Sequence, residues 1–155
     1  MEIQALLNQA EKCKTDADSD ALLATLKDLF GGFEQFANIP VANEEAYVEE
    51  GKPFVRFELN RLYSEFYITM IRPEIRFGEL SLSVVTNFMK DGLGMQSKNW
   101  EAVEGMDDVI VGRPGQTAAD VAELALQCAL ANHQELLERL GVPTKAAKEA
   151  AVASW

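Results

Sequence analysis

The apolar positions at the start of the chain recur every three or four residues, the period of a helix with one buried side. They predict a first helix over residues 2–14, from Ile3, Leu6, Leu7, Ala10 and Cys13. The same period continues in a second helix, through Leu22, Leu23, Leu26, Leu29, Phe30 and Phe33. Gly31 and Gly32 predict an end or a kink of this helix near that point. We therefore expect a helical hairpin over residues 1–37.

Alternation replaces this period after Pro53. The segment Asn38 to Lys52 holds Pro40, Asn43 and Gly51 among four glutamates, which predicts a loop. Apolar residues then alternate with polar ones in two strands of an antiparallel meander, first at Val55, Phe57 and Leu59, then at Phe66, Ile68 and Met70. We expect a turn at Arg72-Pro73-Glu74, because proline cannot donate into a central ladder, and a third strand from Ile75 to Phe77.

Residues 79–91 fit two patterns. Leu80, Leu82, Val84 and Phe88 suit a strand, whereas a helical stripe joins Leu80, Val84, Val85, Phe88 and Met89. We favour the helix, because Lys90 and Gly92 then occupy C-terminal positions. The glycine-bounded segments "NWEAVEG" and "DDVIVG" predict a hairpin.

A long helix is predicted over residues 117–140. Thr117 with Asp120 forms an N-terminal capping pattern, and Gly141 and Pro143 end the helix. Its polar residues share one narrow stripe, so the sheet or a partner should cover most of it. Residues 144–155 are predicted to form a short helix or tail.

The fold class expected is α+β in one domain, residues 1–155. An antiparallel sheet of about three to five strands, from residues 53–112, should pack against the helical hairpin and the long helix.

Charge restricts the partners. The formal net charge is −11, and residues 1–52 hold eleven acidic and four basic side chains, residues 53–98 five and six, and residues 99–155 nine and four. Such flanks repel nucleic acid and anionic lipid. No apolar run approaches the length of a membrane span, and the first residues lack the features of a secretory signal. We expect a cytoplasmic protein that binds another protein, either basic or partly unfolded.

Three aspartates in "TDADSDALL" resemble the start of a calcium loop. Asp16, Asp18 and Asp20 occupy the first three ligand positions of an EF-hand, but Ala21 stands where glycine is needed and Lys27 where glutamate is needed. We instead expect Asp18 or Ser19 to cap the second helix, with all three acids facing a protein surface.

No residues suggest catalysis, a cofactor or a metal site. His133, the one histidine, lies on the apolar side of the long helix without a nucleophile or further ligands at a suitable spacing. We expect it to be packed in the core or at an interface. Cys13 and Cys128 each fall on an apolar helix side, as free thiols do. A hydrolase could use two carboxylates, and adjacent acids occur at Glu44/Glu45, Glu49/Glu50 and Asp107/Asp108. Adjacent side chains point apart on a helix or a strand, so we expect these acids to be solvated surface charge.

Arginines and tyrosines gather in the strand region of this otherwise acidic chain. Two roles are open: pairing with the flanking acids, or binding a peptide or acidic group, since both residue types are frequent at interface hot spots. The candidate partner-binding residues are Arg56, Arg61, Tyr63, Tyr67, Arg72 and Arg76, together with Asp16, Asp18 and Asp20.

The predicted order of helix, three-stranded meander, helix, hairpin and long helix resembles the class I chaperones of type III secretion and the YbjN-like domains. The resemblance covers roughly residues 18–140 and rests on layout and charge. It implies a chaperone-like homodimer that holds an extended client without chemistry. Two alternatives are a nucleic-acid mimic that inhibits a basic nuclease, using the acids of residues 16–50 and 101–108, and a toxin immunity protein.

Overall fold

The computed structural model describes residues 1–62, 67–91 and 100–139. Its elements, in chain order, are the helices α1 (Ile3–Glu11) and α2 (Asp16–Gly31), a 3-10 turn (Glu34–Phe36), the strands β1 (Val41–Glu49), β2 (Lys52–Leu62), β3 (Tyr67–Arg76), β4 (Glu79–Asp91) and β5 (Trp100–Gly112), and the helix α3 (Ala118–Arg139). The chain therefore has the α+β fold expected, with the helices at its two ends.

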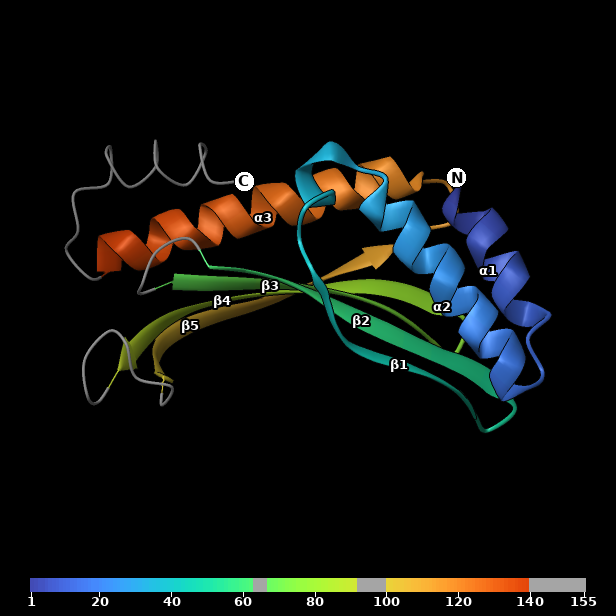
Figure 1. Cartoon of the computed structure of the whole chain (residues 1–155). Coiled ribbons are helices and arrows are strands. Elements are labelled where there is room, and N and C mark those ends of the chain that lie inside the picture. The colour runs from blue at the N-terminus through green and yellow to red at the C-terminus, as the bar shows by residue number, and fades with distance from the viewer. Residues whose placement is uncertain (63–66, 92–99, 140–155) are drawn as a thin grey trace.

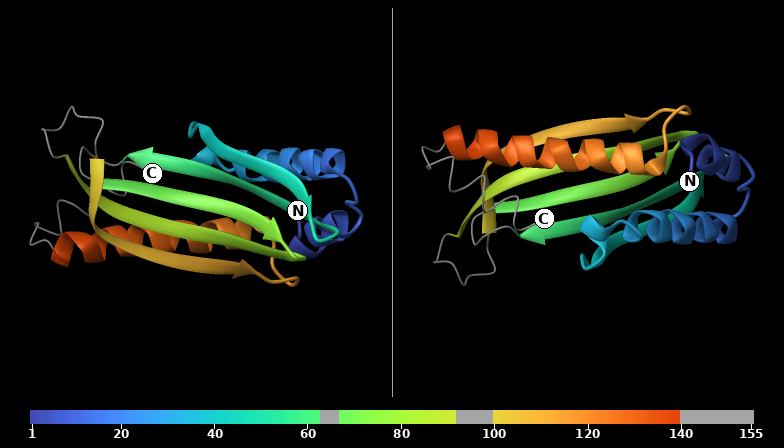
Figure 2. Two further views of the ribbon diagram at one scale, coloured as in Figure 1. Left: turned by 90° about the horizontal axis from the view of Figure 1, so that it is seen from below. Right: turned by 90° about the horizontal axis from the view of Figure 1, so that it is seen from above.

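The five strands form one antiparallel sheet in the order β1-β2-β3-β4-β5. All three helices lie on one face of this sheet: α2 packs against β1 and β2, and α3 packs against β4 and β5 (Figure 1). Seen from below, the strands have no helix in front of them (Figure 2). We call the face opposite the helices the open face.

Alternation along the strands produces the core between the sheet and the helices. Val55, Phe57 and Leu59 of β2 are almost fully buried on the helical side. The same face receives Ile71 and Ile75 from β3 and Leu80, Leu82 and Val84 from β4, which meet Leu6, Leu22, Leu26, Phe30, Val121 and Ala125 from the helices. Burial of this apolar surface is the main source of stability for the fold.

Both N-terminal helices are confirmed, but the cap of α2 is different from the one expected. Thr15 is the N-cap residue: its hydroxyl accepts the Asp18 amide at 3.1 Å, and the Asp18 carboxylate accepts the Thr15 amide at 3.0 Å. This is a capping box, in which Asp18 is the third residue of the helix. Gly32 follows the last residue of α2, as predicted.

The predicted loop over residues 38–52 is wrong, because Val41 to Glu49 form β1. A β-bulge between Ala42 and Glu45 hides the alternation, and Asn43 adopts a positive φ of 52° there. A tight turn at Glu50-Gly51, both with positive φ, then leads into β2.

The predicted turn at Arg72-Pro73-Glu74 is also wrong, since β3 runs straight through it. Pro73 lies opposite Leu82 of β4. On its other side the ladder pairs Arg56 with Glu74 and next Leu59 with Ile71, skipping the residues between. That gap accommodates the missing proline N–H.

Residues 79–91 form the strand β4 and not the helix that we favoured. The helix that the chaperone resemblance needs at this position is therefore a strand. Its inward side is Leu80, Leu82, Val84 and Thr86, with period two. The hairpin expected from "NWEAVEG" and "DDVIVG" is likewise one strand, β5, paired with β4 along its length.

The long helix is confirmed as α3, and its cap is the predicted one. Thr117 and Asp120 exchange hydrogen bonds of 2.9 and 3.2 Å between side chain and backbone. Cys13 and Cys128 are free thiols. The tail predicted over residues 144–155 lies outside the described residues.

Candidate functional site

The open face is divided into a charged half and a small, apolar half. Strands β1–β3 contribute three arginine–glutamate pairs, joining Arg56 to Glu45 at 2.9 Å, Arg72 to Glu58 at 2.8 Å and Arg76 to Glu49 at 2.6 Å. On β4 and β5, Ser81 lies opposite Val111, Ser83 lies opposite Val109, and Val85 lies opposite Asp107; the uncharged members of these pairs are Ser81, Ser83, Val85, Val109 and Val111. We call these five residues the Ser/Val patch.

Glu58 lies on the open face with only 7% of its surface exposed, and both of its carboxylate oxygens accept hydrogen bonds. One oxygen accepts two hydrogen bonds from Arg72, and the other accepts one from Asn43 at 2.7 Å. Burial raises the pKa of the Glu58 carboxyl, but the hydrogen bonds from Asn43 and Arg72 outweigh burial and hold that pKa below its ordinary value. The bulge in β1 places Asn43 for this contact.

Aromatic rings stabilise the same half. Tyr47 stacks on Phe54 with their ring centroids 4.9 Å apart. The guanidinium carbons of Arg56 and Arg76 lie 5.7 and 5.2 Å from the Phe54 centroid. These are cation–π distances. Three of the four candidate arginines are therefore already held by glutamates and rings of this chain, as the pairing alternative required.

The remaining candidates of the strand region are not part of this cluster. Arg61 pairs across the ladder with Thr69, a residue buried on the helical face, so it lies on the opposite side of the sheet from Arg72. Tyr63 lies outside the described residues, and Tyr67 begins β3.

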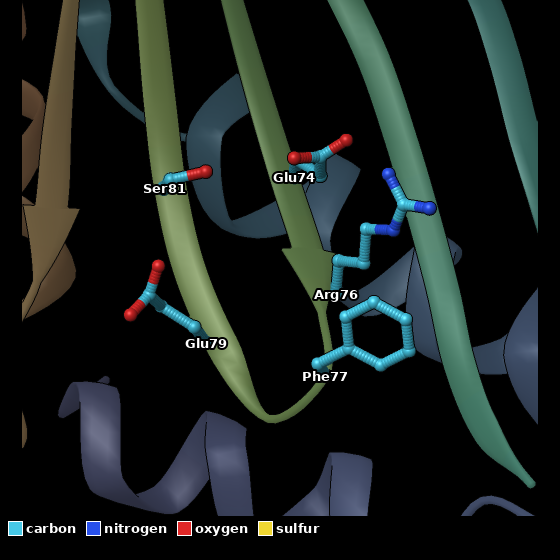
Figure 3. A pocket seen from close by; sticks show the side chains of 5 residues that line it. All are labelled: Glu74, Arg76, Phe77, Glu79 and Ser81. Atoms are coloured by element: carbon cyan, nitrogen blue, oxygen red, sulfur yellow. The ribbon is translucent and has the colours of Figure 1, made fainter. Parts of the chain in front are cut away.

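The turn between β3 and β4 exposes an aromatic ring. Phe77 and Gly78 both have positive φ, 51° and 75°, as a two-residue hairpin turn requires. A bulky residue rarely adopts this conformation, which costs roughly 1–2 kcal/mol, and yet Phe77 is 47% exposed. Its ring lies beside the Arg76 guanidinium, and Phe77 and Arg76 line a shallow hollow of about 260 Å³ together with Glu74, Glu79 and Ser81 (Figure 3).

The three aspartates of "TDADSDALL" have separate positions. Asp18 closes the capping box, and its pKa is lowered by the amides of Lys14 and Thr15. Asp16 accepts a hydrogen bond of 2.9 Å from the Val48 amide of β1. Asp20 is exposed on α2. No group of three or more potential metal-ligating side chains occurs among the residues that the structure describes.

A partly buried polar cluster joins α3 to β5. Asn132 donates to the Asp108 carboxylate at 2.8 Å and lies 3.7 Å from the Cys128 sulfur. Burial, and next the charge of Asp108, raise the pKa of the Cys128 thiol. His133 is 4% exposed, and burial lowers its pKa. These pKa directions favour the protonated thiol of Cys128 and the neutral imidazole of His133, the uncharged forms that pack in a protein interior. A packed position is the one expected for His133.

Sequence reasoning missed Phe77, Val109 and Val111. The pair Phe77-Gly78 between two alternating segments was a usable turn signal, but the turn expected at Pro73 obscured it. Val109 and Val111 were expected in one arm of a hairpin. The structure instead places them on one face of a single long strand, β5, at the outer edge of the sheet.

Comparison with known proteins gives no relative: no family model, no curated protein and no solved structure matches the chain. No helix in the described part of the chain is long and apolar enough to cross a membrane.

Proposed function

We propose that this chain is a non-enzymatic, chaperone-like binding module that holds a basic or partly unfolded protein partner. The observation that supports this most is the open face, which carries exposed apolar side chains on a sheet whose described helices all lie on the other side. Tyr47, Phe77, Val109 and Val111 lie on this face or at its turn, each more than 40% exposed. Val109 and Val111 lie together on β5, and neighbouring exposed apolar side chains of this kind are typical of protein-binding surfaces.

Charge favours a basic partner. The arginines of the open face are neutralised within the chain, whereas Glu74, Glu79 and Asp107 have no ion pair among the described side chains. The net charge of −11 adds long-range attraction for basic proteins and repels nucleic acid.

Affinity purification of the tagged chain from its native host, followed by mass spectrometry, tests the proposal. We expect a basic protein partner that stays bound at moderate salt, because the contacts are partly apolar. Phe77→Asn should weaken capture, since it removes the exposed ring at a position that suits asparagine better. Leu124→Asn, at a 43% exposed position of α3, is the matched control and should not.

Other results would contradict the proposal. A basic nuclease whose binding is lost steeply with rising salt would favour the nucleic-acid mimic instead. Turnover of a small molecule by the purified chain, without a protein partner, would exclude a binding module.

A further inference from the structure

The two outer edges of the sheet differ. At β1 the helix α2 occupies the edge: the Asp16 carboxylate accepts the Val48 amide at 2.9 Å, and the Ser19 hydroxyl donates to the Tyr47 carbonyl at 3.1 Å. An ion pair between Lys27 and Glu44 and the β-bulge lie along the same strand. Bulges, charges and covering elements are the means by which proteins prevent strand addition.

Over Met106–Gly112 the outer edge of β5 has no bulge, and its charges are all acidic; the irregularity in the ladder with β4 lies farther along the strand, opposite Phe88 and Met89. The strand Trp100–Gly112 contains no lysine, arginine or proline. Among the residues described, no backbone or side-chain group bonds to the outward N–H and C=O groups of Met106 to Gly112. The helix α3 packs against β5 from the helical face. Val109 is 63% and Val111 41% exposed beside this edge.

We propose that the outer edge of β5 binds an extended, basic segment of a partner protein as an additional strand of the sheet. This deepens the proposed function, on which it rests, by naming the binding site and mode. Backbone hydrogen bonds would supply affinity, and Val109 and Val111, the β5 members of the Ser/Val patch, would lie beside alternate apolar side chains of the segment.

Charge selects the occupant. The strand β5 includes Glu101, Glu104, Asp107 and Asp108 and no base, and Asp107 and Asp108 are exposed. A second copy of the chain would bring Asp107 and Asp108 of both strands together and double a net charge of −11. A segment in which lysine or arginine alternates with apolar residues would neutralise these carboxylates.

The probe is a capped peptide of about ten residues, a common strand length, in which valine and lysine alternate. Its control has the same sequence with every second amide N-methylated, so that one edge cannot donate hydrogen bonds. We expect the first peptide to bind and to slow hydrogen exchange at alternate amides of Met106–Gly112, but not at β1. The methylated peptide should bind roughly tenfold or more weakly.

Two matched variants test the site. Val109→Lys places a like charge beside the peptide and should weaken binding roughly tenfold or more. Val41→Lys makes the same change at a 40% exposed position of β1 and should leave affinity nearly unchanged. Far-ultraviolet circular dichroism establishes that both variants are folded.

Three results would overturn the inference. Equal binding of both peptides, or equal loss in both variants, would mean charge attraction without strand addition, and leaves the proposed protein-binding function standing. A dimer that Val109→Lys dissociates, seen by ultracentrifugation, would assign the edge to a second copy. Failure of the unmodified peptide to bind, when the affinity purification does capture a partner, would place that partner elsewhere.

Discussion

Glu58 shows how a single carboxylate can be nearly buried on a face that has no helix over it. Arg72 and Asn43 supply its hydrogen bonds, and they come from β3 and from the bulge of β1. A buried charge is tolerated only when its partners replace the lost water. Since 14 and 15 residues separate the partners from Glu58, no local sequence pattern could reveal them.

Glu58→Gln should lower the free energy of unfolding by about 2 kcal/mol at neutral pH, because it removes the charge opposite Arg72. The pKa of Glu58 is lowered in the folded state, so its stabilisation is present above the ordinary carboxyl pKa and lost as pH falls through the folded value. The gap between wild type and variant should therefore shrink towards acid pH. Urea unfolding at several pH values measures it.

The control is Glu45→Gln, which breaks the pair with Arg56 at a glutamate side chain 43% exposed. Exposed pairs are worth about 1 kcal/mol or less. If Glu58→Gln and Glu45→Gln lower the free energy of unfolding equally, the burial of Glu58 does not strengthen its ion pair.

The strands of this protein were harder to predict than its helices, for reasons specific to each strand. A period of three to four identified all three helices, and a capping pattern marked the start of α3. In β4, however, Val84, Val85 and Phe88 satisfy helical and strand periods together, and the choice depends on pairing with β3 and β5. In β1 the bulge shifts the alternation, and in β3 the gap in the ladder tolerates Pro73. Such tertiary context overrides local preference.

The candidate site was predictable in composition but not in arrangement. Its arginines were identified, and pairing with acids was one of the two expected roles. The partners Glu45 and Glu49 lie in a segment predicted to be a loop, and only the β1–β2 hairpin brings them to the open face.

Asp16→Ala should expose the edge of β1. The Val48 amide would lose its acceptor, at a cost of roughly 0.5–1.5 kcal/mol, and its hydrogen exchange should become faster. Asp16→Asn retains an acceptor oxygen while removing the charge, so exchange at Val48 should stay close to wild type. Unchanged exchange in the alanine variant would show that the Asp16 carboxylate does not hold the strand.

At the scale of the whole molecule, the excess of acidic side chains predicts like-charge repulsion. The net charge is −11, and each of the four ion pairs described has at least one side chain about 30% or more exposed. Exposed pairs contribute little, whereas uniform charge destabilises the compact state.

Raising sodium chloride from about 0.02 to 0.5 M should therefore raise the Tm, because screening within a few ångströms relieves the repulsion. Scanning calorimetry at constant pH measures this effect. Potassium chloride is the control and should give the same shift, since screening is not specific to one cation. A lower Tm at high salt would mean that the ion pairs outweigh the repulsion.

The contact between Asp16 and Val48 also limits how far any assembly can grow. A sheet with two available edges can extend in both directions and build a fibre. Here α2 bonds to the edge of β1 at Tyr47 and Val48. If β5 adds a strand as proposed, the sheet therefore lengthens from one side only, which disfavours the two-sided growth of a fibre.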